Sequence, residues 1–542
     1  MRLDELWIEE FKNLRDIRVD FDESSPYTVL VGENGSGKSN LIEALAWIFR
    51  NLDLDEPTAF SYELKYRCRG NDVRVRAAGG HSPEFWVKQA DTDEYLELPK
   101  SKFMSLDEQE RPYFRPAFVF GYYSGPSDRL ASLFERHRER FYRVIIQPKL
   151  TRKKRLVRSN ALRRLFYAQT LHGQFALLAF FMNSADGEAD DLAFLRDHLQ
   201  IEGLDSVLFS LKRPPWRRRG GDPRFWNAEG EVREFLGWLF SASMVPMRMD
   251  RRIPVELTKN PSVECLYLFL PGKDALEQVY ASYANQYAFF TALESTHTSK
   301  LLSEVRTRVR VTAAAGGGAI TYRDLSEGEQ QLLLVLGLLK FTSEDEALFL
   351  LDEPDTHLNP AWSIQYLEFL NRFIANRESC HVLMSTHDPL VFSRLLKSEV
   401  RIFRRDDSGR VHVEEPLLDP RGMGVQAILT SDLFRLRSTL DIETQRVLDR
   451  QRQLSGKKGE LSPEEEVELR TINTKLYHLG LSKSIRDPLY ELFITKWTER
   501  EKPEWAEAVE LTPKQLKDRE ALAAEIASEI AGEMASERGP AK

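Results

Sequence analysis

The sequence has few cysteines, no long apolar run and no excess of basic charge. Its three cysteines, Cys68, Cys265 and Cys380, lie far apart and form no C-x-x-C pair, which argues against a disulfide framework or a zinc knuckle. Buried, inert thiols are therefore expected. The longest apolar runs reach about ten residues, roughly half of a membrane span, so we expect no transmembrane helix and no membrane partner.

The overall charge and the N-terminal residues indicate which partners and which cell compartment to expect. A net charge of −8 gives no general attraction to nucleic acid or acidic lipid, so any contact with a polyanion would need a local basic patch. The N-terminal residues MRLDELWIEEF carry acids where a signal peptide has a basic region followed by an apolar block. We therefore expect a cytoplasmic protein.

The chain of 542 residues, 42% of them hydrophobic, is long enough for several domains. Apolar strands alternate with helices in 1–127 and again in 310–422, which predicts an α/β fold with a mostly parallel, covered sheet. Short alternating segments from about 58 to 100 predict antiparallel hairpins in a small β lobe. We interpret 128–309 as a helical insertion without sustained heptads, and 423–542 as a helical C-terminal extension.

A complete phosphate-binding motif lies near the N-terminus. Residues 32–39, GENGSGKS, match G-x-x-x-x-G-K-[ST] between a predicted strand and a predicted helix, a context that disfavours an ordinary glycine turn. Lys38 would reach the β and γ phosphates of ATP, and the Ser39 hydroxyl would bind Mg²⁺. The predicted ATP-binding residues are Gly32, Asn34, Gly35, Ser36, Gly37, Lys38, Ser39 and Asn40.

Two later strands end in polar side chains. Asp352 ends the apolar run LFLLD and could hold the Mg²⁺, while Glu353 follows where a base could deprotonate the attacking water. His387, after the apolar strand HVLMST, is a candidate γ-phosphate contact. Without the phosphate loop, the two acids would also fit a helix cap before Pro354, and a lone histidine would more often be structural.

The stretch 324–331, DLSEGEQQ, resembles a second phosphate cradle. Ser326 and Gly328 stand at the start of an apolar helix, where donors and the helix dipole favour an anion. Together, the phosphate loop, LSEGEQQ, LLDEPDTHLNP and STHDP resemble the motifs of ABC-type ATPases of the RecF, SMC and OLD-like group. The resemblance implies an ABC-type P-loop domain with halves at 1–127 and 310–422. It also implies a head-to-tail homodimer, or a larger assembly, in which Ser326, Gly328 and Glu329 contact the partner's ATP.

The sequence departs from the ABC pattern at two places. Glu327 and Glu329 stand where transporters have glycine-like positions, and no clear Gln loop follows the phosphate loop. The segment 117–130, AFVFGYYSGPSDRL, occupies that place, with Tyr122 and Tyr123 as candidates for its role. Residues 12–15 match the position of the family's adenine contacts.

Two basic segments could contact DNA or RNA. Residues 149–165 contain eight basic residues and no acid, and 212–226 mixes arginine with tryptophan, so phosphate contacts and base stacking are as plausible as solvated helix faces. No metal-spaced cluster typical of a nuclease is found in the sequence. The domain plan resembles the stand-alone ATPases of bacterial anti-phage systems such as Septu and PARIS, which implies a regulator of a separate nuclease or toxin. A RecF-like DNA-repair clamp and a nuclease with an unrecognised site are the alternatives.

The last part of the chain carries clear helix signals. Ser462-Pro463 with Glu465 forms a capping box, and another helix is predicted to start at Thr512-Pro513. An apolar stripe in that last helix suits a partner helix or, as the somewhat better alternative, the core of the same chain. The stripe consists of Leu522, Ile526, Ile530 and Met534.

Overall fold

The computed structural model divides the chain into two compact units, Met1–Arg421 and Gly422–Lys542, which are described separately. The described residues are 1–22, 24–89, 94–108, 111–145, 164–182, 188–217, 220–252, 261–342, 345–374, 376–457, 461–479, 493, 496–497, 499–502, 504–505 and 511–537.

A seven-stranded sheet forms the centre of the first unit. Its inner strands read as apolar runs because both faces are covered, and every residue of β3, β15 and β16 is buried. All neighbouring strands pair in parallel except β17 and β18, which form an antiparallel hairpin. In spatial order the strands are β18 (Val411–Glu414), β17 (Val400–Arg405), β3 (Tyr27–Gly32), β16 (Cys380–Ser385), β15 (Ala347–Asp352), β8 (Phe118–Tyr123) and β9 (Leu165–Tyr167).

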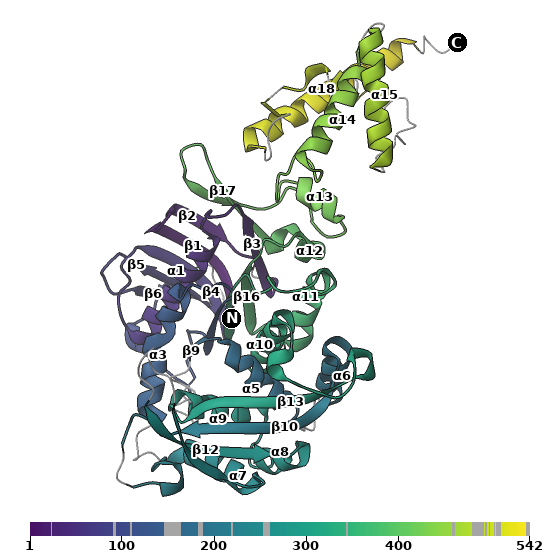
Figure 1. The fold of residues 1–542 in the computed structure, drawn as a ribbon. Helices are drawn as coiled ribbons and strands as arrows, with labels where there is room; N and C mark the ends of the chain where they lie inside the picture. The colour runs from purple at the N-terminus through teal and green to yellow at the C-terminus, as the bar shows by residue number, and fades with distance from the viewer. Residues whose placement is uncertain are drawn as a thin grey trace. The chain divides into compact units, whose positions relative to one another are not determined.

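Helices cover this sheet on both sides. Helix α1 (Lys38–Leu54) lies on one side, and α10 (Glu327–Thr342), α11 (Pro360–Phe373) and the short α12 (Pro389–Phe392) lie on the other (Figure 1). The α1 residues share a core with Leu348, Leu350 and Leu383 of the sheet. This parallel, doubly covered sheet confirms the predicted α/β class.

The antiparallel hairpins predicted after α1 are present. They join the two N-terminal strands in a six-stranded antiparallel sheet, whose buried residues belong to the same core as α1. Its order is β2 (Leu14–Asp20), β1 (Arg2–Phe11), β4 (Tyr62–Cys68), β5 (Asn71–Ala77), β6 (Glu84–Lys88) and β7 (Tyr95–Glu97), followed in the chain by the short α2 (Lys100–Phe103).

The segment 128–309 is only partly helical, which corrects its interpretation as a helical insertion. Its helices are α3 (Arg129–Ile145), α5 (Thr170–Phe180), α6 (Glu188–Leu199), α7 (Gly230–Ala242), α8 (Lys273–Tyr280) and α9 (Gln286–Thr298). A five-stranded antiparallel sheet accompanies them, in the order β11 (Met247–Arg252), β12 (Ser262–Leu270), β10 (Ile201–Lys212), β13 (Leu302–Val311) and β14 (Ala319–Thr321). In β13, arginines alternate with apolar residues, which is the period of a half-buried strand, but this basic segment was interpreted as part of the helical insertion.

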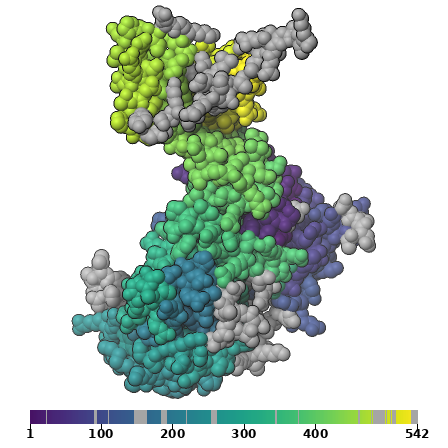
Figure 2. All heavy atoms as spheres, turned by 90° about the vertical axis from the view of Figure 1, so that its right-hand side faces the viewer, coloured from purple at the N-terminus to yellow at the C-terminus, as the bar shows by residue number. Residues whose placement is uncertain are grey.

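Helices of the insertion pack against helices of the segment 310–422. Helix α5 crosses α10 so closely that a Cβ at Gly337 would lie 2.3 Å from the Ala176 Cβ. Phe194 of α6 packs on Phe369 and Phe373 of α11, with ring centroids 5.5 and 5.0 Å apart. Figure 2 shows the surface where α6 lies against segments that follow it in the chain, among them α11.

The described residues of the second unit are mainly helical. Helices α14 (Ile442–Ser455) and α15 (Pro463–His478) are antiparallel and joined by the Arg450–Glu468 ion pair at 2.8 Å, and α15 begins with the predicted Ser462–Glu465 capping box. Ile526 and Ile530 of α18 (Pro513–Glu537) are buried, which supports packing of the stripe on its own chain. A short helix, α13 (Val425–Thr430), starts the unit.

Two predicted absences can be compared with the described part of the chain. No helix there is long and apolar enough to cross a membrane. All three cysteines are buried and unpaired, as expected for inert thiols.

Candidate functional site: a nucleotide-binding strand edge

The phosphate loop follows β3 and leads directly into α1. Gly35 and Gly37 adopt φ values of 76° and 111°, a left-handed region that favours glycine, and a Cβ at Gly32 would lie 2.3 Å from the Phe403 carbonyl oxygen. Lys38 Nζ donates to the carbonyl oxygens of Gly32 at 2.7 Å and Glu33 at 3.1 Å. Burial lowers the Lys38 pKa to about 8, although Asp352 and Glu353 oppose the shift.

Side chains outside the loop hold its backbone in place. Asn13 Nδ2 donates to the Gly35 carbonyl at 2.9 Å, Asn40 Nδ2 donates to Asn13 Oδ1 at 2.6 Å, and Arg405 donates to the same Gly35 carbonyl. Asn13 belongs to the segment proposed to contact adenine, and Lys12 of that segment pairs with Glu43 of α1. Arg405, at the end of β17, was not recognised in the sequence.

The predicted metal ligands meet at one point although 313 positions separate them. Ser39 Oγ donates to Asp352 Oδ1 at 2.9 Å, and the Ser385 hydroxyl donates to the same oxygen. Arg129 Nη2 lies 3.4 Å from Asp352 Oδ2 and supplies a balancing positive charge. A hydroxyl and a carboxylate are the hard oxygen ligands that Mg²⁺ prefers, so these residues fit the predicted ion.

Glu353 and His387 stand together beside this point. Glu353 has a φ of 55°, and its backbone N–H donates to the Ser385 carbonyl at 3.1 Å. Its Oε1 lies 3.7 Å from His387 Nε2. Burial, and secondarily Asp352, raises the Glu353 pKa, whereas burial and Lys38 lower the His387 pKa. The pair thus favours a neutral imidazole beside a carboxylate that binds a proton more readily than usual.

In the second predicted cradle, the hydrogen-bond donors of Ser326 already have an acceptor in the same chain. Glu329 Oε2 accepts hydrogen bonds from the Ser326 backbone N–H at 2.7 Å and from its hydroxyl at 2.8 Å, which is a capping box at the start of α10. This explains a glutamate at a position where transporters have a smaller residue. A Cβ at Gly328 would lie 2.4 Å from the His357 carbonyl oxygen, so the signature packs directly on the loop after β15.

The segment expected to replace the Gln loop is strand β8 and the turn after it. Tyr123 is in register with Asp352, and Ser124 Oγ lies 3.1 Å from Thr356 Oγ1 of the loop after β15. Burial raises the pKa of Tyr122, the residue before Tyr123 on the same strand. Arg129, two residues inside the insertion, covers the Tyr123 ring at 5.7 Å. Arg129 lies near the end of the segment 117–130, but its contact with Asp352 was not predicted from the sequence.

The basic segments are described only in part. Residues 149–163 of the segment 149–165 lie outside the described residues. In 212–226, the Trp216 indole N–H donates to the Ser299 carbonyl and the Trp226 indole N–H donates to Glu264, each at 2.7 Å. These hydrogen bonds favour a structural role for both rings over stacking on bases.

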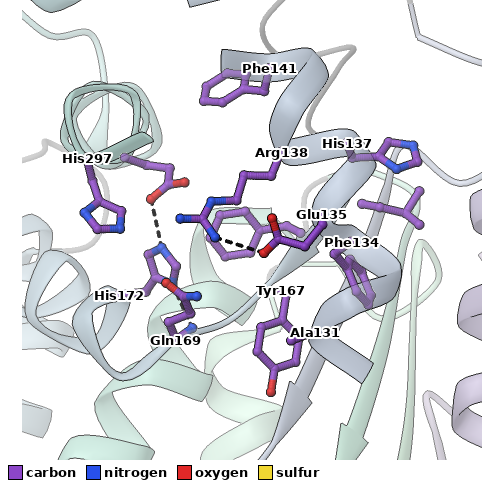
Figure 3. A pocket seen from close by; sticks show the side chains of 13 residues that line it. Ala131, Phe134, Glu135, His137, Arg138, Phe141, Tyr167, Gln169, His172 and His297 are labelled. Atoms are coloured by element: carbon purple, nitrogen blue, oxygen red, sulfur yellow. Dashed lines mark hydrogen bonds and ion pairs between the residues drawn. The ribbon is translucent and has the colours of Figure 1, made fainter. Parts of the chain in front are cut away.

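A small cavity of about 40 Å³ lies between α3, β9, α5 and α9 (Figure 3). His172 Nε2 and Glu294 Oε2 are 2.8 Å apart at its wall, and burial lowers the pKa of the neighbouring His297 to about 4. The phosphate-loop residues do not line this cavity. Nor does any group of three His, Cys, Asp or Glu side chains suited to a metal occur in the described residues.

The class is that of P-loop ATPases. It is defined by a phosphate loop after β3, a histidine after the adjacent strand β16, and two acids at the end of the next strand, β15. The model of the family described as "AAA domain, putative AbiEii toxin, Type IV TA system" matches residues 27–55 and 46–393. The chain belongs to this family. Its fold is α/β, with a P-loop domain that carries a large insertion and a C-terminal extension.

Two individual similarities accompany the family match. The Septu protein PtuA of Bacillus mycoides (strain KBAB4) is 27% identical over 124 residues, which cover 22% of this chain and 17% of that protein. The chain thus matches only a small part of that curated relative. A crystal structure of an SMC head bound to the C-terminal winged-helix domain of ScpA shares 13% identity with a TM-score of 0.30, covering 77% of this chain and 97% of that one.

Proposed function

We propose that this chain is an ATP-hydrolysing regulator of a bacterial anti-phage defence system. The observation that carries the ATPase part is the contact between Ser39 and Asp352, which brings the phosphate loop and the acid-ended strand together with Glu353 beside them. The defence role is supported by the partial similarity to the Septu protein PtuA.

The strand edge supplies a role for each predicted residue. Lys38 would exchange its two carbonyl partners for the β and γ phosphates, and Ser39 with Asp352 would hold Mg²⁺, which neutralises phosphate charge when bound. Glu353 would accept a proton from water as its oxygen attacks the γ-phosphorus and ADP leaves. His387, kept neutral by burial, would orient the γ-phosphate or that water.

ATP would also join two copies of the chain. Ser326 and Gly328 of one copy would contact the nucleotide held by the phosphate loop of the other. Because Glu329 occupies the Ser326 donors within the chain, its carboxylate would have to turn away when the partner's phosphate arrives. Glu329 would then keep the signature closed until an ATP-loaded partner is present.

The effector in this proposal is a separate nuclease or toxin that the ATPase controls. The absence of a metal-holding cluster in the described residues is compatible with an effector on another chain. A DNA-repair clamp of RecF type, acting without an effector, is the alternative.

The test is to express tagged Glu353→Gln from its native locus with neighbouring genes intact and identify what co-purifies in ATP. We expect ATP binding to persist, turnover to fall roughly 100-fold or more, and a second protein to be recovered in fixed ratio. Lys38→Ala is the matched control, because it should lose ATP and therefore the trapped complex. Wild-type turnover by Glu353→Gln would contradict the assigned base, and recovery of nucleic acid without a second protein would favour the clamp.

A further inference from the structure

The five-stranded sheet of the insertion has one covered face and one exposed face. Along β13 the buried residues Val305 and Val309 alternate with the exposed Arg306, Arg308 and Arg310. The covered side is the one on which Phe235 of α7 packs on Phe209 of β10, with ring centroids 6.3 Å apart. Figure 1 shows β13, β10 and β12 side by side in this sheet. The opposite side, called the open face below, faces solvent.

The strand register determines which side chains share the open face. One row across the strands contains Met247, Tyr267, Ser210 and Glu304, and the next contains Phe269, Leu208 and Arg306. Apolar and aromatic side chains therefore lie on β11 and β12, and arginines lie along β13. The face is divided into an apolar strip and a parallel basic strip.

Both strips are accessible. Phe269 is 38% exposed, and Met247 and Met249 are 50% and 46% exposed. The side chains of Arg306 and Arg308 are each 53% exposed. Such large apolar side chains beside arginines on one exposed face indicate a binding surface rather than an ordinary solvated sheet.

The acids that contact this basic strip are already engaged. Glu304 pairs with Arg306 at 3.0 Å and with Arg323 at 2.8 Å, and Asp205 lies 3.8 Å from Arg308 and accepts a hydrogen bond from Ser206. Arginine donors therefore exceed acceptors, and the strip carries a net positive charge. An anionic ligand with an apolar component matches both strips.

We propose that the open face binds single-stranded DNA. Unpaired bases would stack on Phe269 and Tyr267 and contact the two methionines, while phosphates would follow the arginines of β13. Bases stacked inside a duplex cannot reach such rings. Single-stranded RNA offers the same phosphates and unpaired bases, and the oligouridylate measurement below distinguishes the two. This surface is separate from the predicted basic segments except at Lys212, which is in register with Cys265.

The test measures fluorescence anisotropy of a labelled oligothymidylate of about 20 nucleotides with the full chain and no nucleotide. Phe269→Ala should weaken binding at least 5-fold, because one stacking contact is lost. The double variant Arg306→Ala, Arg308→Ala should weaken it further. It should also reduce the salt slope by about 0.7 for each lost phosphate contact, measured from about 50 to 200 mM salt.

Arg252→Ala is the matched control, since Arg252 is an exposed arginine of β11 on the opposite face. It should bind the probe like the wild type, and all variants should keep the wild-type circular dichroism. Unchanged affinity in both open-face variants, or no binding by the wild type at low salt, would overturn the proposal. Tighter binding of a duplex, of oligouridylate or of an acidic peptide would assign the face to another ligand. Repeating the measurement in Lys38→Ala separates this result from the proposed ATPase function.

Discussion

The seven-stranded and five-stranded sheets of the first unit present their functional residues in different ways. The first is largely parallel and covered on both sides, so its candidate chemistry lies at the carboxyl ends of β3, β15 and β16. The second is antiparallel and covered on one side, so its exposed residues form a continuous face. A doubly covered sheet can act only through its edge, whereas a half-covered sheet can act through a surface.

The difference also explains how far each sheet tolerates change. Around the phosphate loop and the signature, a Cβ added at Gly32 or Gly328 would lie 2.3 or 2.4 Å from a backbone carbonyl oxygen. The open face instead consists of partly exposed side chains that can be shortened without breaking the core. Variants at the two sheets should therefore separate ATP turnover from surface binding.

The largest expected effect comes from Ser326→Arg. The bulky cation should block the signature's contact with a partner's nucleotide, and we expect turnover to fall roughly 1000-fold while each chain still binds ATP. Single-turnover hydrolysis and equilibrium ATP binding measure the two quantities. Binding of oligothymidylate to the other sheet should not change. Normal turnover would contradict the head-to-tail model.

A pH-dependent effect is expected at Asp355, a buried carboxyl in the loop after β15. Burial raises its pKa to about 7, with further repulsion from Asp388, against the hydrogen bond donated by Thr386. Between about pH 4 and 7 the folded carboxyl thus keeps a proton that the unfolded chain releases. Stability from this group should therefore fall as pH rises, by on the order of 4 kcal/mol at most.

Asp355→Asn removes this titration while keeping a similar shape. Thermal unfolding midpoints of the nucleotide-free wild type and variant should diverge from about pH 4 to 7, with the wild type losing stability relative to the variant. Parallel curves over this range would show that Asp355 is ionised in the folded protein. An exposed carboxyl, Glu84 of β6, changed to Gln serves as the control and should give no such divergence.

The smallest expected effects come from two glycine-to-alanine substitutions. One is in α10, which covers the seven-stranded sheet, and the other is in α7 of the insertion. Gly337→Ala would place its Cβ 2.3 Å from Ala176 where α10 crosses α5, and should destabilise the protein by about 1–3 kcal/mol. A Cβ added at Gly237 of α7 would have no atom within 4 Å, so Gly237→Ala should stabilise its helix by about 0.5–1 kcal/mol. Chemical denaturation measures both. Equal effects would mean that the two regions are packed alike.

The predicted and observed structures agree best where a short, local sequence pattern determines the structure. The glycines of the phosphate loop, the apolar β15 and the capping box at Ser462 are local patterns, and each is present. The insertion is where prediction was least accurate. Segments such as LSEVRTRVRV alternate basic and apolar residues, and in an arginine-rich region this pattern was interpreted as part of a helical segment.

Some residues of the candidate site could not be predicted from the sequence for a different reason. Asn13 and Arg129 lie in segments that were expected to contact adenine or to replace the Gln loop, and Arg405 lies in neither. They reach the loop and Asp352 only because separate elements pack around the same strand edge. The position of Glu329 was read from the family pattern, but its capping role depends on the local helix start. The assigned catalytic and metal-binding roles stay predictions until variants are measured.

The sequence by itself determined the phosphate loop, the acids at the end of β15 and the α/β class, because these depend on short runs of residues with defined spacing. The tertiary structure decided which distant residues share a surface. Strand register places Phe269 beside Leu208 and Leu208 beside Arg306, and a shift of one residue would turn these side chains into the core. Register is set by packing over the whole sheet, so the open face exists only in the folded chain.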